Sequence, residues 1–282
     1  MLGSMLRGAA KTMLSRHLDF LPRTLFLHTL CLGRSSKVGT KNFEDIRKDK
    51  SLYVDKTEFA EKLLDNQRAV LMRPPRTGKT LFLDMLDYLF DKSNKAKFDD
   101  LFGDLYFAKC EARDQANTYY VLPITLPAGP LPDDLAACKK EYHQRAMIGV
   151  NTLLGRHPDV EEKLKIPQQT YYEQIDYAGC ITAIRDIVGR ENLMVLVDEY
   201  DRAPMEEYIS QVNKYGLENY DSTAPSNVKG ALQQFLFTVK DLGCRYLVTG
   251  INTVPGADTC SFIHRASIYS NVHTHTHKLR ST

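Results

Sequence analysis

The hydrophobic positions of this chain form short continuous runs, separated by longer segments in which apolar residues recur every three or four positions. Four of the runs have the length and composition of buried strands. A continuous run, unlike an alternating one, is typical of a strand that is covered on both faces, as in a parallel sheet. The four runs are Ala69–Met72, Tyr119–Leu126, Leu193–Val197 and Arg245–Thr249.

The segments between these runs have helical periodicity. Asp55 and Glu58 are expected to form a capping box at the start of the first helix, where their side chains satisfy free backbone N–H groups. Gly243 is expected to end the last helix, because glycine readily adopts the left-handed conformation of a C-cap. Helices are expected from the capping box at Asp55–Glu58 through Leu64, at 81–90, over most of 133–190 with breaks near Gly155–Pro158 and Pro167, and at about 226–241.

Strands and helices therefore alternate along the chain. This order predicts an α/β fold in which helices cover both faces of a parallel sheet. Pro123 lies inside the second run and has no N–H to donate to a neighbouring strand. It is expected at a sheet edge or at a bulge.

Composition indicates a globular protein and identifies no partner. The chain has 282 residues, of which 43% are hydrophobic and 26% charged, with a net charge of +2. Its six cysteines include no C-x-x-C pair, which favours reduced thiols in an intracellular protein. No apolar run approaches the roughly 20 residues that span a bilayer. A cytoplasmic location is expected.

The first 42 residues differ from the rest in charge. They contain seven basic side chains and one acidic side chain, so they carry +6 while the remaining residues carry −4. Apolar residues at helical spacing accompany these basic residues, as in a mitochondrial transit peptide. A disordered leader and a wrongly assigned gene start are the alternatives. Residues 1–40 are expected to be a basic leader outside the fold.

The first candidate for chemistry follows the first apolar run and reads Arg-Pro-Pro-Arg-Thr-Gly-Lys-Thr over Arg73–Thr80. A loop between a buried strand and a helix directs backbone N–H groups and the positive end of the helix dipole at a phosphate. Gly78 permits close approach of the backbone. Lys79 is expected to reach the β- and γ-phosphates, and the Thr80 hydroxyl to coordinate Mg²⁺. The usual motif begins with glycine, where this chain has arginine.

The second candidate is the acidic end of the third run, Asp198-Glu-Tyr-Asp201. A carboxylate at the end of a buried strand can hold Mg²⁺, the role expected for Asp198, while Glu199 is placed to orient and activate an attacking water. Adjacent carboxylates repel each other, and a metal ion relieves that repulsion. A strand that exits into an acidic loop is the alternative.

The third candidate, Thr249, ends the last run. In ATPases with an added strand between the phosphate-loop strand and the metal-binding strand, a polar residue at this place contacts the γ-phosphate or the lytic water. Thr249 has that position. Equally, Thr249 could be a residue at the end of a strand that has no role in the reaction.

Together these segments resemble the predicted AAA-ATPase-like family, from about residue 40 to residue 270. Members of that family are P-loop ATPases, often joined to a C-terminal nuclease-like domain of the PD-(D/E)XK type. The family's loop begins with arginine, which accounts for Arg73, although Pro75 replaces a usual arginine and Thr77 a usual aromatic residue. The segments that carry the resemblance are Phe43–Arg47, Tyr53–Thr57, Arg73–Thr80, Val197–Asp201 and Thr249–Gly250.

The resemblance implies an additional-strand, AAA-like P-loop NTPase that binds ATP with Mg²⁺ and hydrolyses it. The expectation that the base is adenine follows from the resemblance, and the sequence contains no guanine-reading N-K-x-D motif. Asp201 matches the family's second acid and receives no role. Arg73 and Arg76 either contact phosphate or belong to a solvated basic loop. The implied nucleotide-binding residues are Arg73, Arg76, Thr77, Gly78, Lys79 and Thr80, the metal ligands Thr80 and Asp198, and the catalytic residues Glu199, Lys79 and Thr249.

The expected domains are the leader 1–40, an AAA-ATPase-like domain over 41–270 and a low-complexity tail over 271–282. The region after the last strand is too short for a helical lid or a nuclease domain, so a protein partner or a second copy is expected to supply a lid or an arginine finger. No basic stripe interleaves with aromatic residues, and no nucleic-acid partner is expected. The alternatives to an ATPase are a non-hydrolysing nucleotide-binding switch or interaction module, and an inactive fragment of a longer ATPase-nuclease protein.

Overall fold

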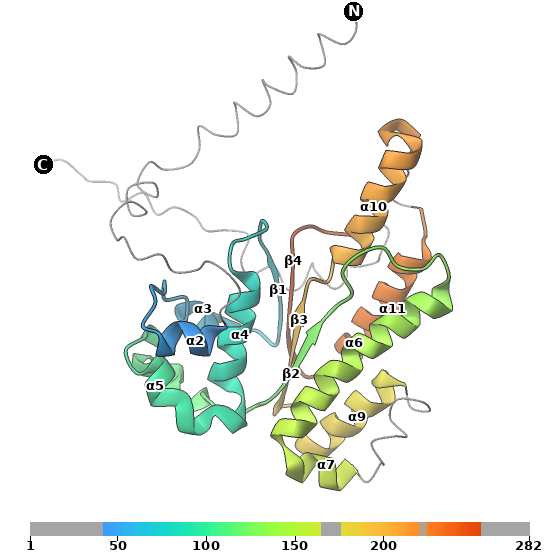
Figure 1. Cartoon of the computed structure of the whole chain (residues 1–282). Coiled ribbons are helices and arrows are strands. Elements are labelled where there is room, and N and C mark those ends of the chain that lie inside the picture. Colours follow the sequence, from blue (N-terminus) through green and yellow to red (C-terminus); the bar gives the residue numbers. More distant parts are fainter. Residues whose placement is uncertain (1–41, 165–175, 220, 222–223, 255–282) are drawn as a thin grey trace, which may run out of the picture. The chain divides into compact units, whose positions relative to one another are not determined.

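The computed structural model describes residues 42–164, 176–219, 221 and 224–254 (Figure 1). Every described residue belongs to the second of the two units into which the chain divides, Lys41–Thr282. The expected leader, the break at Pro167 and the tail over 271–282 lie outside the described residues. None of the helices in the described ranges has the length and apolar composition needed to cross a membrane.

Four parallel strands form one sheet in the order β1-β4-β3-β2. The last strand in sequence, β4, therefore lies between β1 and β3. The predicted parallel sheet is confirmed, and each of the four apolar runs forms a strand. The strands are β1 (Arg68–Met72), β2 (Tyr120–Thr125), β3 (Leu193–Asp198) and β4 (Arg245–Gly250).

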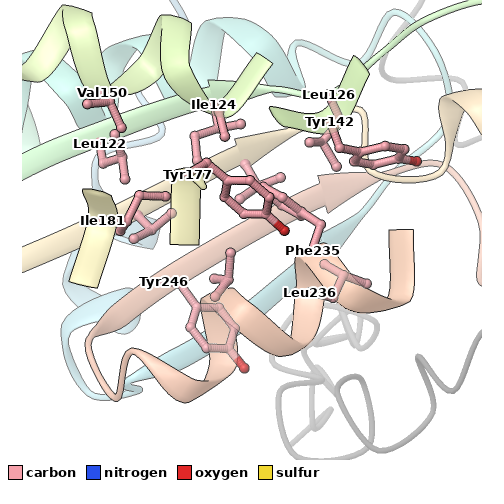
Figure 2. Close-up of a cluster of buried hydrophobic side chains, with 14 of the residues drawn as sticks. Leu122, Ile124, Leu126, Tyr142, Val150, Tyr177, Ile181, Phe235, Leu236 and Tyr246 are labelled. Carbon is pink, nitrogen blue, oxygen red and sulfur yellow. The ribbon is translucent and has the colours of Figure 1, made fainter. Parts of the chain in front are cut away.

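Successive residues of each strand face opposite sides of the sheet, so the sheet separates two hydrophobic cores. In the core shown in Figure 2, strand residues such as Leu122 meet helix residues such as Ile181. The Phe235 ring contacts those of Tyr142 and Tyr177, with centroids 6.0 and 5.8 Å away. The helices on this side are α6 (Leu135–Arg156), α7 (Pro158–Leu164), α9 (Tyr177–Val188) and α11 (Asn227–Asp241).

The second core contains the alternate strand residues, among them Val121, Met194 and Leu247. The Phe43 and Phe102 rings stack within it at a centroid distance of 5.0 Å. Burial on both sides explains why the strands are continuous apolar runs. The helices on this side are α2 (Phe43–Lys48), α3 (Glu58–Leu64), α4 (Lys79–Phe90) and α5 (Phe98–Phe102).

The edge position predicted for the second run is confirmed, because among the described strands β2 is last in the order and pairs with β3 alone. Pro123 is tolerated there because an edge strand leaves alternate N–H groups outside the ladder. Besides α2 and α5, the helix after β3 and the short 3₁₀ helices were not predicted from the sequence. These elements are α10 (Arg202–Tyr215), η2 (Lys92–Lys97), η3 (Tyr106–Lys109), η4 (Glu111–Gln115) and η5 (Leu217–Asn219).

The capping box predicted from Asp55 and Glu58 is wrong, because α3 begins only at Glu58. The N-cap residue is Thr57, and its side chain makes no capping hydrogen bond. The Asp55 carboxylate instead accepts the Thr57 N–H and hydroxyl, each at 2.8 Å, and the Tyr106 N–H at 2.7 Å. Instead of capping α3, Asp55 therefore joins Thr57 to Tyr106, which lies 51 positions away in the sequence.

Candidate functional site

The carboxyl ends of β1, β4 and β3 lie next to one another at one edge of the sheet. The register pairs Met72 of β1 with Gly250 of β4, and Val197 of β3 with Val248 of β4. Only one strand therefore separates the loop after β1 from the acidic segment after β3. The fold brings together the two segments that the sequence had singled out.

The loop from Arg73 to Gly78 turns tightly between β1 and α4. The Arg73 N–H extends the pairing with β4 by donating to the Gly250 carbonyl at 3.1 Å. Two loop residues have left-handed backbones, Arg76 with φ of 61° and Gly78 with φ of 84°. Glycine adopts that conformation at little cost, which explains the need for Gly78 immediately before the helix.

Lys79 is the first residue of α4, and its side chain folds back over the loop. Its Nζ donates to the carbonyl oxygens of Arg73 and Pro74 at 2.9 and 3.0 Å. The Thr77 hydroxyl also donates to Pro74 O, at 2.8 Å, which tightens the turn. The ammonium charge, the free N–H groups of the first helical turn and the positive end of the helix dipole thus lie together, which favours an anion.

Asp198 connects three segments at the end of β3. Its Oδ2 accepts the Thr80 hydroxyl at 2.7 Å, and its Oδ1 accepts the Thr249 hydroxyl at 2.5 Å. Oδ1 also accepts the Glu199 N–H at 2.9 Å. Only 5% of Asp198 is exposed. One buried carboxylate therefore joins the start of α4 to the ends of β3 and β4.

Glu199 turns out of the sheet in a left-handed conformation, with φ of 57°. Such a backbone costs roughly 1–2 kcal/mol for a residue with a side chain, so the surrounding contacts must hold it. The Glu199 carboxylate lies 3.7 Å from Arg202 Nη1, at the first residue of α10. The turn thus places a carboxylate and a guanidinium side by side beyond the strand end.

These segments surround one cavity of about 370 Å³. This volume is within the range of small-molecule sites. Predicted site residues that line it include Arg76, Gly78, Lys79, Thr80, Asp198 and Glu199. Arg73, Thr77 and Thr249 are not among the lining residues, and Thr249 reaches the site through its bond to Asp198. The remaining lining residues are Pro75, Asp201, Arg202, Gly250 and Ile251.

Tyr200 and Asp201 fix the segment that follows β4. Asp201 Oδ2 accepts the backbone N–H groups of Ile251 and Asn252 at 2.8 and 2.6 Å, and the Tyr200 hydroxyl donates to Asn252 O at 2.5 Å. A Cβ on Gly250 would lie 2.3 Å from the Tyr200 ring, so only glycine fits there. The acid to which the sequence assigned no role therefore shapes one wall of the cavity.

Thr80 and Asp198 supply oxygen atoms at adjacent positions, which suits a hard cation such as Mg²⁺. The described part of the chain contains no group of three or more His, Cys, Asp or Glu side chains placed to hold a metal ion. A Mg²⁺ ion at Thr80 and Asp198 would need further ligands, such as phosphate oxygens and water.

The sequence reasoning missed Arg202. Arg202 directly follows the acidic segment, but its approach to the cavity depends on the left-handed turn at Glu199. No local sequence pattern predicts that turn. The one sequence signal for Arg202 was its position immediately after Asp201.

The parallel sheet, the phosphate-type loop before α4 and the insertion of β4 between β1 and β3 define a P-loop NTPase fold of the additional-strand type. The model of the predicted AAA-ATPase family matches residues 37–258. The chain belongs to this AAA-ATPase-like family, a membership that points to ATP binding.

The chain is also similar to an uncharacterized protein in the vnfD 5′ region of Azotobacter chroococcum mcd 1. The two are 32% identical over 167 residues, which is 58% of this chain and 28% of that protein. The chain thus matches well under half the length of this relative. No solved structure matches the chain.

Proposed function

We propose that this protein binds ATP with Mg²⁺ in the cavity between the loop and the acidic segment, and hydrolyses it. The observation that carries the proposal is the pair of hydrogen bonds from Thr80 and Thr249 to Asp198. These bonds place the helix start that favours an anion beside the carboxylate that favours a cation. A metal-bound triphosphate requires both.

In this proposal the loop residues Arg73–Thr80 hold the phosphates. The N–H groups at the start of α4 donate to phosphate oxygens, and Lys79 exchanges its two loop carbonyl partners for β- and γ-phosphate oxygens. Arg76 lines the cavity and adds positive charge. Arg73 and Thr77 contribute through the backbone of the loop.

Mg²⁺ would be held by the Thr80 hydroxyl and by Asp198, directly or through water, and would neutralise part of the phosphate charge. Glu199 extends beyond the strand end and would orient the attacking water for in-line displacement at the γ-phosphorus. Thr249 would act through Asp198, which it holds in place.

Arg202 offers an alternative to the expectation that a partner or a second copy supplies an arginine finger. Because it lines the cavity and lies 3.7 Å from the Glu199 carboxylate, we propose that this chain provides its own arginine beside the phosphates. A second copy or a protein partner remains our proposed source of a lid.

Two measurements test the function, thermal unfolding with Mg²⁺ and ATP and steady-state phosphate release. A ligand at 100 times its dissociation constant adds about 2.7 kcal/mol to the stability of the folded state. We expect this stabilisation in the wild type and not in Lys79→Ala. Glu199→Gln should keep the stabilisation and lose phosphate release by about 10²- to 10⁴-fold.

The control is Glu162→Gln, an exposed glutamate of α7, which should behave as the wild type. A wild type that ATP does not stabilise would contradict the proposal. Intact binding with equal background release in wild type and Glu199→Gln would support the non-hydrolysing switch. Loss of cooperative unfolding in the full chain would support the inactive fragment.

A further inference from the structure

We propose that Lys56 is a second lysine of the phosphate site, a positioning residue that acts on the loop through the Thr77 carbonyl. This inference rests on the proposed nucleotide binding. Lys56 lies in the segment Tyr53–Thr57, which helped to identify the family but has no part in the function described so far.

The backbone around Lys56 is fixed on both sides by bonds to η3. The preceding residue, Asp55, accepts the Tyr106 N–H at 2.7 Å. The following residue, Thr57, is fully buried, and its hydroxyl accepts the Phe107 N–H at 3.0 Å. These two contacts cross about 50 residues of sequence and leave little freedom in the position of the Lys56 main chain.

The Lys56 side chain reaches the phosphate loop from this anchored position. Its Nζ donates to the Thr77 carbonyl oxygen at 3.2 Å and lies 3.4 Å from where a Cβ on Gly78 would be. A trans peptide points its C=O and N–H in opposite directions. By holding the Thr77 carbonyl, Lys56 therefore directs the Gly78 N–H away from itself, and Gly78 lines the cavity.

Two lysines thus hold carbonyl groups of the loop. Lys79 donates to the carbonyl oxygens of Arg73 and Pro74, and Lys56 donates to that of Thr77. Within the described residues, no carboxylate oxygen lies within 4 Å of Lys56 Nζ, and none of these residues forms an ion pair with it. When phosphates take Lys79 away from its carbonyls, Lys56 keeps the loop in shape and adds attraction for the anion.

The test measures the dissociation constant of Mg²⁺-ATP for the full chain by calorimetry at several salt concentrations. We expect Lys56→Met to weaken binding by about tenfold or more, the size of a lost charge-assisted hydrogen bond, and to reduce its salt dependence. Lys56→Arg, which keeps the donor and the charge, should restore most of the affinity. The matched control is Lys95→Met, an exposed lysine of η2, which should bind as the wild type does.

Wild-type affinity and salt dependence in Lys56→Met would overturn this inference while leaving the proposed function intact. Failure of the wild type to bind Mg²⁺-ATP would instead overturn the proposed function. If Lys56→Met does not unfold cooperatively, Lys56→Gln replaces it, because glutamine keeps a donor but removes the charge. A purely structural lysine would leave the salt dependence of binding unchanged in that variant.

Discussion

At the scale of single residues, the buried carboxylates of this protein differ in their partners. Asp87 forms a bidentate ion pair with Arg156, at 2.6 and 2.9 Å. Asp198 has only hydroxyl and backbone donors, from Thr80, Thr249 and its own segment, and no Lys, Arg or His nitrogen of the described chain lies within 4 Å of it. A buried carboxylate without a basic partner is costly. A metal ion in the adjacent cavity would compensate that charge.

The ion pair between Asp87 and Arg156 predicts how the stability of the protein changes with pH. Burial raises the pKa of Asp87 above its ordinary value, while the bond from Arg156 opposes that rise. Arg156→Met should therefore raise this pKa further and destabilise the protein by about 1–3 kcal/mol near neutral pH. A carboxyl group whose pKa is raised by folding contributes stability when protonated, and loses that contribution as pH rises through the folded-state pKa.

The deficit of Arg156→Met in urea unfolding should thus be larger at about pH 8 than at about pH 5. Arg145→Met, an exposed arginine of the same helix α6, is the control and should change little at either pH. Equal deficits at both pH values would contradict the assignment of the effect to Asp87.

The sequence anticipated the main side chains around the cavity but not how they connect. Lys79 and Asp198 could be predicted because one lies in the loop-to-helix segment after a recognisable strand and the other ends such a strand. Lys56 and Arg202 could not, because one depends on contacts with η3 across about 50 residues and the other on a strained turn. Thr249 was correctly placed at a strand end, but nothing local indicates that its hydroxyl is turned to Asp198.

At the scale of elements, α6 packs very closely on β2. A Cβ added to Gly149 of α6 would lie 2.3 Å from the Pro123 carbonyl oxygen and 3.0 Å from a side-chain carbon of Ile124. The absence of a side chain at this one position sets the distance between helix and edge strand. A Cβ added to Gly155, near the end of the same helix, would meet no atom within 4 Å.

We therefore expect Gly149→Ala to destabilise the protein by about 1–3 kcal/mol, because a close-packed contact must open. Gly155→Ala should leave stability unchanged or raise it by a few tenths of a kcal/mol, because alanine favours helix. Thermal unfolding of Gly149→Ala and Gly155→Ala measures both changes in stability. A Gly149→Ala variant as stable as Gly155→Ala would contradict the observed packing.

The strands, which are continuous apolar runs, were predicted from the sequence, and the exposed helix α10 was not. All four strands are continuous apolar runs, so their burial is visible in the sequence. Of the residues of α10, only Ala203 and Pro204 are buried, and the helix extends away from the sheet (Figure 1). Its apolar residues Met205, Tyr208, Ile209 and Val212 do recur at helical spacing, but the sheet does not bury them, and no helix was predicted there.

At the scale of the whole domain, strand order determines the site. Insertion of β4 between β1 and β3 brings together residues of the loop, of the acidic segment and of the last strand end. Alternation of strands and helices predicts a parallel sheet but not the order of its strands. That order was implied by the family resemblance alone, because pairing between distant strands leaves no local pattern.

The most direct test of the central claim is a crystal structure of the full chain with Mn²⁺ and a non-hydrolysable ATP analogue, in which anomalous scattering locates the metal. The account predicts a manganese peak about 2 Å from the Thr80 hydroxyl oxygen and beside Asp198, with the triphosphate contacting Lys79. Nucleotide and metal bound away from Thr80 and Asp198 would contradict it.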